Sequence, residues 1–207
     1  MTMNGRKAQA ALNDERILDA ARAVFIADPG APISAVAERA GVGISALYRR
    51  YRSKDELLQK LCTDAIRTYA DIAESAAMSQ DGPWEVFVSF MRDALDARSG
   101  SLTIRLAGQF TVSEELLAEV PRAFENTRRV LERAKTAGEV RSEIEVGDIS
   151  LLLEQLQAVD VGDESRTSQL RHRYLMLILD GLHHVSAAKL PGPAPTWDEI
   201  GSRYDAK

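Results

Sequence analysis

The sequence predicts an all-α protein built from two helical domains, and three observations support that prediction. Apolar residues recur at spacings of three and four along nearly the whole chain, which is the period of an amphipathic helix. Alanine and leucine are plentiful, whereas aromatic residues make up only 6% of the 207 residues. No segment shows the strict alternation of a half-buried strand, and hydrophobic residues at 45% of the total can supply a core.

The first helix is expected from about Asp14 to Ala27. Asn13 is a suitable N-cap, and apolar residues follow it at helical spacing. Asp28-Pro29-Gly30 then ends the helix. The preceding residues 1–12 are polar and carry two basic side chains, so they predict a flexible arm ahead of a domain at residues 13–60.

Two short helices joined by a tight turn are expected next. The first runs from Ile33 to Ala40, Gly41 supplies the left-handed residue of the turn, and the second runs from about Ile44 to Tyr51. Ser53 then caps a helix that continues to about Ala77, with Glu56 completing a capping box. Such a pair forms a helix-turn-helix motif, whose second helix can enter the major groove of DNA.

The rest of the chain is expected to be helical as well. Glycine and proline residues separate its segments, and Pro121 is expected to disturb one of the long helices. The expected helices cover residues 84–95, 102–110, 113–138, 147–161 and 165–188, within a second domain at 61–190 that a tail at 191–207 follows.

Positive charge is concentrated in the first domain, although the whole chain carries a net charge of −5. Residues 1–62 have a balance of +3, and the remainder has a balance of −8. From Ala40 to Lys54 there are four basic residues and no acidic one. Phosphate binding needs a local positive patch rather than a basic protein, so this segment predicts DNA contact, with a solvated helix face as the alternative.

Several other classes of function lack a signature in this sequence. There is no apolar run of about 18 residues and no apolar stretch at the N-terminus, so we expect no membrane span, no secretory signal and a cytoplasmic location. Cys62 is the only cysteine and is expected to be a buried structural thiol, with a redox sensor as the alternative. The histidines His172, His183 and His184 show no zinc-ligand spacing, and no catalytic triad or phosphate-binding loop is visible. We therefore expect no metal, no cofactor and no enzymatic activity.

The segment from Arg16 to Leu61 closely resembles the DNA-binding domain of TetR-family repressors. The matching pieces are IL-x-AA in the first helix, Phe25 near its end, AGV at Ala40–Val42 and LYRRYRSKDELL at Leu47–Leu58. Ala137–Leu153 and Leu175–Leu182 look like segments of the same family, most similar to regulators with an SbtR-like C-terminal domain. The resemblance implies a TetR/AcrR-family homodimer that binds the major groove of double-stranded operator DNA and is released by a small-molecule effector of unknown identity.

The sequence departs from the family pattern near the turn motif. Ala31-Pro32 replaces a common threonine, Gly43 stands where a small hydroxyl is often found, and Ser45 stands where a glycine is common. Tyr51 replaces the usual phenylalanine at the end of the second short helix. These differences leave the expected fold unchanged and concern individual DNA contacts.

The resemblance places the DNA contacts on the two short helices and just after them. Tyr48 is expected to contact a phosphate, with core packing as the alternative. Arg49 and Arg50 point about 100° apart on a helix, so one can read a guanine edge while the other binds phosphate. Ile44 fits either a thymine-methyl contact or packing on the preceding helix. The expected DNA-binding residues are Ile33, Ser34, Gly43, Ile44, Ser45, Tyr48, Arg49, Arg50 and Lys54.

The same resemblance implies an effector pocket and a dimer interface in the second domain. The pocket residues would be Trp84, Phe87, Phe90, Met91, Gln109, Phe110, Phe124 and Arg128, with ordinary core packing as the alternative for each. This set is low in acidic residues, so it does not indicate a cationic ligand. The interface residues would be Leu152, Leu156, Leu175, Ile178, Leu179 and Leu182, which would form a four-helix bundle with the partner subunit.

Two other functions stay open at this point. A helical enzyme could use one of the histidines or a pair of carboxylates, and a helical adaptor could bind only protein. Neither has a reason to place an acid-free basic helix directly after a glycine turn. The segment LYRRYRSKDELL therefore favours a DNA-binding regulator.

Overall fold

The structure is a computed structural model that describes residues 3–98, 102–103, 106–183 and 189–205. The described residues form an all-α fold, as expected. The helices are α1 (Met3–Ala27), α2 (Ile33–Ala40), α3 (Ile44–Arg50), α4 (Lys54–Met78), α5 (Pro83–Ala97), α7 (Glu114–Thr136), α8 (Val146–Gln157), α9 (Glu164–Leu182) and α10 (Trp197–Asp205). Within these ranges the one isolated β-bridge joins Val140 to His183.

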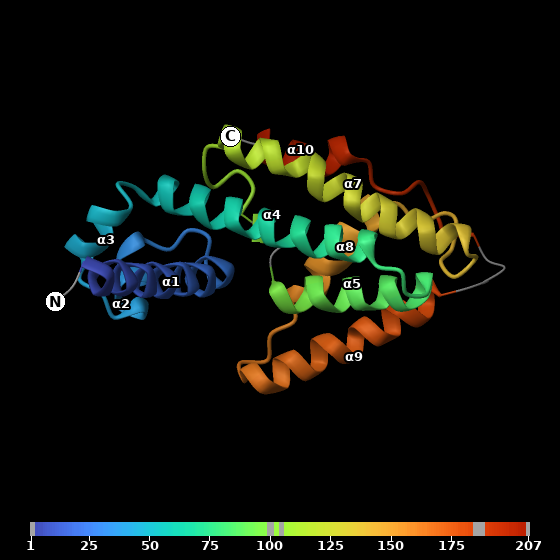
Figure 1. The fold of residues 1–207 in the computed structure, drawn as a ribbon, viewed down its shortest axis with the longest axis horizontal. Helices are drawn as coiled ribbons and strands as arrows, with labels where there is room; N and C mark the ends of the chain where they lie inside the picture. Colours follow the sequence, from blue (N-terminus) through green and yellow to red (C-terminus); the bar gives the residue numbers. More distant parts are fainter. Residues whose placement is uncertain (1–2, 99–101, 104–105, 184–188, 206–207) are drawn as a thin grey trace.

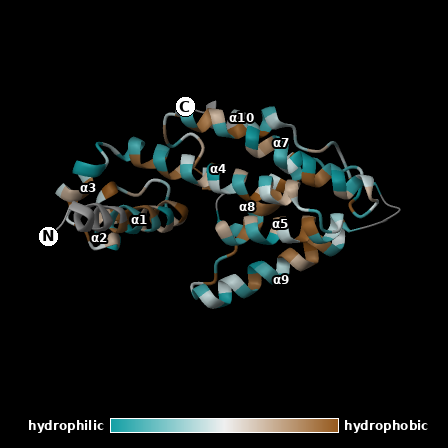
Figure 2. Cartoon of the chain, viewed as in Figure 1, coloured by the Kyte–Doolittle hydropathy of each residue, from teal (hydrophilic) through white to brown (hydrophobic). Residues whose placement is uncertain are grey.

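The helices are arranged as two groups that α4 connects. Figure 1 shows α1, α2 and α3 together at one end, with α4 leading from them into the larger group and running alongside α7. Helices α5 and α9 lie on the other side of α4, and α10 lies next to α7. Hydrophobic and hydrophilic residues alternate around each helix (Figure 2), as amphipathic helices that share a core require.

Buried residues from each helix of the small domain pack together and fix the turn motif. Phe25, Val36 and Leu47 come from three different helices and are completely buried together. Gly41 has φ 65° and ψ 34°, the left-handed conformation predicted for the turn. The Ser53 hydroxyl accepts a hydrogen bond from the Glu56 amide, which confirms the predicted cap of α4.

The first helix begins earlier than expected. It starts at Met3, so the expectation that residues 1–12 form an arm before the helix is wrong for residues 3–12, and Asn13 is not an N-cap. Ala8, Ala10 and Ala11 are strong helix formers, and no proline interrupts the segment. The helix therefore continues through Asn13.

Helices α4 and α7 form the most extensive contact in the larger domain. Arg67 of α4 forms ion pairs with Glu115 and Glu119 of α7, at 2.5 and 2.9 Å. The Thr127 hydroxyl donates to the Tyr69 hydroxyl between the two helices, at 3.1 Å. Helix α7 also runs through Pro121, an exposed residue, without ending there, so the expected disturbance does not divide the helix.

The single cysteine is buried in α4. Cys62 is completely inaccessible, and burial raises the pKa of its thiol to about 12. The thiolate, which is the reactive form, is therefore disfavoured. Cys62 is a structural core residue, as the sequence predicted.

The segment between α5 and α7 differs from the expected helix at 102–110. Leu102 and Thr103 are helical, residues 106–110 form turns and bends, and residues 104–105 lie outside the described ranges. Gly108 has φ 74°, a conformation that ends regular helix. Leu102 and Leu106 are nevertheless buried, so the segment is packed on the core.

The C-terminal elements end and begin at other places than expected. Helix α8 ends at Gln157, earlier than predicted, and α9 ends at Leu182, so that the predicted extension over 184–188 lies outside the described residues. The segment treated as a tail contains α10, whose Trp197 ring packs edge-to-face on Phe124 with 5.3 Å between ring centroids. The proline run at residues 191–195 therefore does not prevent a further helix from packing after it.

Candidate nucleic-acid interface

The turn between α2 and α3 sets the direction of α3. Gly41 donates its amide to the Glu38 carbonyl, and the Arg16 guanidinium donates to the Ala40 carbonyl at 2.9 Å. These bonds satisfy the carbonyls at the end of α2. Gly43 then caps α3 with open space around the position of a Cβ atom, so the start of α3 is free of neighbouring protein.

One face of α3 packs on the core and the other faces solvent. Leu47 and Tyr51 are buried, as expected for residues four apart on one face. Ile44, Ser45 and Tyr48 are exposed, and the Tyr48 side chain is 48% accessible. Core packing of Tyr48 is therefore excluded, and the outward face of α3 carries Ile44, Ser45 and Tyr48 of the predicted DNA-binding set.

The two arginines of α3 have different roles. Arg50 forms a bidentate pair with Asp14 of α1, through Nε at 2.8 Å and Nη2 at 2.7 Å. The Tyr51 hydroxyl donates to the same carboxylate at 2.6 Å. The exposed Arg49 makes no hydrogen bond or ion pair with any residue in the described ranges. Of the two arginines of α3, Arg49 is therefore the one without a protein partner in the described ranges.

The electrostatics of this corner stabilise the charged form of Asp14. The hydrogen bond from Arg50 lowers the pKa of the Asp14 carboxyl, and the Tyr51 hydroxyl adds to the effect. Burial, followed by the hydrogen bond to Asp14, raises the pKa of the Tyr51 hydroxyl well above its usual value. Asp14 is thus ionised at neutral pH and Tyr51 is a hydrogen-bond donor, which fixes the end of α3 on α1.

Lys54 is occupied within the protein. Its ammonium donates to the carbonyls of Pro29 and Ala31, at 2.9 and 2.8 Å, and lies 5.0 Å from the centre of the Phe25 ring. Lys54 is among the expected DNA-binding residues, and a contact of its ammonium with a DNA phosphate would have to compete with these bonds. Ile33 is likewise buried as a core residue of α2, whereas Ser34 is exposed beside it.

The predicted pocket residues are mostly core residues in the structure. Phe87, Phe90 and Met91 are buried in α5, and Trp84 stacks on His183 with 4.0 Å between ring centroids. Phe110 is also buried, Gln109 is exposed, and Arg128 is an exposed residue paired with Glu125. Phe124 packs on Trp197. The alternative of ordinary core packing thus describes most of this set.

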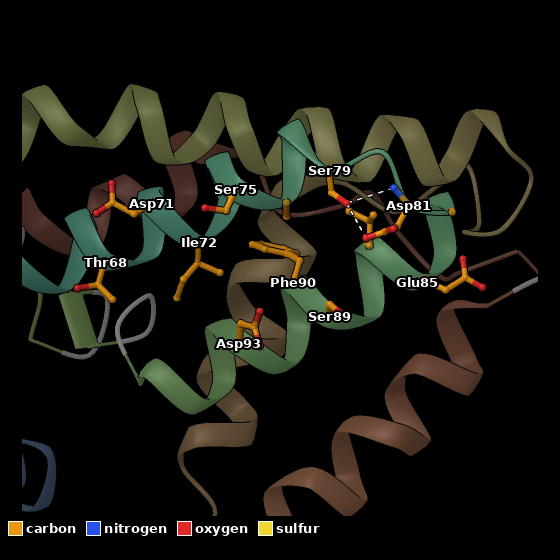
Figure 3. Close-up of a pocket in the computed structure, with 13 residues that line it drawn as sticks. Thr68, Asp71, Ile72, Ser75, Ser79, Asp81, Glu85, Ser89, Phe90 and Asp93 are labelled. Carbon is orange, nitrogen blue, oxygen red and sulfur yellow. Dashed lines mark hydrogen bonds between the residues drawn. The ribbon is translucent and has the colours of Figure 1, made fainter.

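A groove of about 720 Å³ lies between α4 and α5. Figure 3 shows Asp71 and Ile72 of α4 on one side of it and Phe90 and Asp93 of α5 on the other. Phe90 is the only predicted pocket residue that lines this groove. Its carboxylates are those of Asp71, Asp81, Glu85 and Asp93. The groove is acidic, in contrast to the predicted set.

The predicted interface leucines belong mostly to the interior of one subunit. Leu156, Leu175, Leu179 and Leu182 are buried, which corrects the expectation that their surface is left over for a partner. They occupy the inward stripe of their helices, because the core of this domain is larger than the sequence indicated. Leu152 and Ile178 are half-buried.

The outward face of α9 has an apolar stripe of its own that the sequence reasoning missed. Leu170, Tyr174 and Leu177 follow each other at helical spacing, and the Leu177 side chain is 58% exposed. Gly181 continues the stripe, with nothing in contact with the position of a Cβ atom. The two stripes have the same helical spacing in the sequence, and only their exposure in the structure distinguishes them. The sequence therefore offered no signal for which stripe faces outward.

An N-terminal helix-turn-helix domain with an outward, unpaired recognition face defines a DNA-binding protein of the regulator class. Residues 17–61 match the family of bacterial regulatory proteins of the tetR type, and residues 82–184 match the C-terminal domain of SbtR-like transcriptional regulators. The chain belongs to the tetR family of transcriptional regulators. A comparison with curated proteins gave no significant match.

Solved structures share the fold. A TetR transcription regulatory protein from Mycobacterium vanbaalenii is 27% identical, with a TM-score of 0.55 over 86% of this chain and 99% of that one. The regulator LfrR from Mycobacterium smegmatis, in complex with proflavine, is 22% identical, with a TM-score of 0.60 over 81% and 96%. A gamma-butyrolactone receptor, an ArpA-like protein, is 19% identical, with a TM-score of 0.53 over 96% and 95%. Throughout the described residues, no helix is both long and apolar enough to cross a membrane.

Proposed function

We propose that this protein is a repressor that binds its operator as a homodimer and leaves it when a small-molecule effector binds the C-terminal domain. The observation that carries the proposal is the outward face of α3. Tyr48 and Arg49 are exposed there, while Leu47 and Tyr51 anchor the same helix to the core. A helix held in this way can place its exposed side chains against base edges without losing its orientation.

Dimerisation follows from the size of the recognition surface. One short helix reads too few bases for useful specificity, and a dimer reads two half-sites roughly 34 to 36 Å apart. The exposed stripe of α9 that contains Tyr174 and Leu177 supports an interface there, because exposed leucines at helical spacing are the usual contact of a four-helix bundle. Gly181 would allow close approach of the partner helix.

Effector control is proposed to act through α4. The first turn of α4 is bonded to the segment before α7: the Asp55 carboxylate accepts from the Thr111 amide at 2.8 Å, and the Gln59 amide donates to the Thr111 carbonyl at 2.9 Å. A ligand that displaces this segment would therefore displace the start of α4, and with it the DNA-binding domain. Two of the similar structures are a proflavine complex and a receptor for a lactone, so this fold accommodates organic ligands.

The test begins with selection of bound DNA from a random pool, using the full chain. We expect a palindromic sequence whose binding weakens steeply with salt, because the protein neutralises several phosphates. Compounds that raise the melting temperature are then titrated into the complex. Failure to enrich any sequence would refute the DNA-binding proposal, and enriched DNA that no stabilising compound releases would refute the effector proposal alone.

A further inference from the structure

A cleft of about 750 Å³ lies between the DNA-binding domain and the C-terminal domain. Ile26 and Ala27 of α1 line it on one side, and Ala97 and Arg98 at the end of α5 line it on the other. Figure 1 shows the C-terminal end of α1 facing the C-terminal end of α5 across this space. The cleft is separate from the groove between α4 and α5, with which it shares no lining residue.

Two arginines from different domains carry unpaired donors in the lining of this cleft. Arg171 of α9 is only 8% exposed; its Nε donates to the Val159 carbonyl and its Nη2 to the Gln157 carbonyl, but its Nη1 has no partner. Arg22 of α1 pairs with Asp19 through Nη1, and its buried Nε also has no partner. Buried donors without acceptors are rare and costly, so both positions point to a missing acceptor.

A third arginine adds positive charge at the same place. Arg98 ends α5 with φ 50°, and no other non-glycine residue in the described ranges has a positive φ. Burial first, and then the nearby charge of Arg98, lower the pKa of Arg171. Two guanidinium groups that repel each other at the edge of a cleft would both gain from an anion between them.

The carboxylates of the cleft already have donors. Asp19 pairs with Arg22, Glu164 pairs with Arg98, and Asp96 pairs with His172 at 3.0 Å. Asp160 accepts a hydrogen bond from the Gly162 amide at 2.8 Å. Glu154 is not without a partner either. The lining has more carboxylates than arginines, so the unpaired donors, rather than the net charge, select the ligand.

Apart from Arg39, Gln157 and Gly162, the remaining lining is apolar. Its small and aliphatic side chains are those of Ala23, Ile26, Ala27, Ala97, Leu102 and Ala158. A cleft of this volume is within the range of small-molecule sites, which commonly combine apolar walls with a few directed polar groups. The ligand therefore needs an acidic group and a short apolar body.

We propose that this cleft binds a small organic anion, whose carboxylate or phosphate accepts hydrogen bonds from Arg171 and Arg22 and whose apolar body lies against Ile26 and Leu102. Such a ligand contacts both domains at once. If the protein regulates transcription as proposed above, the ligand changes operator affinity, and operator DNA changes ligand affinity by the same factor.

The binding test uses four probes with the same eight-carbon chain on the full-length protein, measured by calorimetry. Octanoate and octyl phosphate distinguish a carboxylate from a phosphate ligand, while octanamide and octylamine are the neutral and cationic controls. We expect one or both anions to bind at least about tenfold more tightly than either control, because charge-assisted hydrogen bonds require the anion. Equal binding of octanamide, or no binding of either anion, would overturn the proposal.

Variants then locate the site. Arg171→Gln and Arg98→Gln are expected to weaken anion binding by about tenfold or more, whereas Arg129→Gln, which removes an exposed arginine of α7, leaves it unchanged. Because Arg171 also supports two backbone carbonyls, Arg98→Gln and Arg22→Gln decide the outcome if Arg171→Gln lowers the melting temperature. Wild-type affinity in both of these variants would place the anion elsewhere.

The regulatory consequence is tested separately on the selected DNA. A change of about threefold or more in DNA affinity at saturating anion would support coupling between the domains. Unchanged DNA affinity would overturn the coupling and leave the binding site intact. Absence of DNA binding in the free protein would instead refute the proposed function, and this result is independent of anion binding.

Discussion

The carboxylate of Asp14 in α1 holds the end of α3 through Arg50 and Tyr51, at 2.6 to 2.8 Å. Asp14 lies 36 residues before Arg50, so this contact joins the first helix of the small domain to the recognition helix. It pairs one arginine of α3 within the protein, although the side chain of Arg50 stays 56% exposed, and it leaves the adjacent Arg49 without a protein partner in the described ranges. The orientation of the reading face thus depends on an acidic residue outside the helix-turn-helix pair.

This contact predicts a pH-dependent contribution to stability. Asp14→Asn is expected to cost about 1 kcal/mol at neutral pH, because the Arg50 side chain is partly exposed and the pair is partly screened. The folded pKa of Asp14 is below the usual 3.8, so the contribution is complete above that value and is lost as the pH falls through the lower folded value. Urea unfolding at several pH values checks this: a difference between the proteins that stays constant down to the lowest pH would contradict it.

Arg49→Ala is expected to relax base discrimination at one position of each half-site by roughly 1 to 3 kcal/mol. The reason is that the guanidinium of Arg49 is exposed and unpaired within the described ranges, and the direction of α3 points it away from the core. Titration of single-base variants of the selected DNA measures the effect. Arg129→Ala, a change of an exposed arginine in α7, is the control. If Arg49→Ala keeps the base preference of the wild type, α3 does not read the sequence.

A substitution of Lys54 is expected to lower stability, whereas a substitution of Tyr48 is expected to lower DNA affinity alone. Lys54→Met removes the charged donor of two carbonyls and should lower stability by roughly 1 to 3 kcal/mol, measured by thermal unfolding. Tyr48→Phe removes an exposed hydroxyl, so it should leave stability unchanged and weaken binding to all DNA sequences by about fivefold. If Lys54→Met instead keeps the stability of the wild type and weakens DNA binding, the role of the lysine is to bind phosphate.

Two neighbouring leucines of α9 are expected to respond differently to the same change. Leu179 is 1% exposed, so Leu179→Glu buries a charge in the core of one subunit and should prevent stable folding. Leu177 faces outward, and Leu177→Glu should give a folded monomer. Sedimentation velocity together with circular dichroism distinguishes these outcomes. A dimeric Leu177→Glu protein with wild-type helicity would remove the outward stripe from the interface.

Gly147→Ala is expected to displace the C-terminal segment. A Cβ atom at this position would overlap the backbone carbonyl oxygen of Pro195. Because Gly147 and Pro195 meet through their backbones, neither can move aside by a simple change of side-chain rotamer. The displaced segment should lose the contact of Trp197 with Phe124 and should be cleaved faster by protease. Gly43→Ala, at a glycine with open space and φ −65°, is the matched control. Equal cleavage of the two variants would show that the segment does not depend on Gly147.

The sequence by itself determined the helical class, the turn motif and the core of the small domain. These features depend on local chemistry: Ile33–Ala40 has one apolar face, Gly41 adopts a conformation that favours glycine, and Ser53 caps the helix that follows it. The family resemblance also depended on this segment. Local signals of this kind survive in a single sequence because each involves residues within a few positions of one another.

Only the tertiary structure decided which side of each later helix faces outward and which charges are occupied. The leucines at 175, 179 and 177 have the same hydrophobicity, and contacts with distant helices alone make two of them core and one surface. Lys54 and Arg50 are equally basic in sequence, but carbonyls and a carboxylate more than 20 residues away bind them. The cleft that contains Arg22 and Arg171 exists only because the two domains face each other. Burial and pairing depend on long-range packing, which the period of a single helix does not encode.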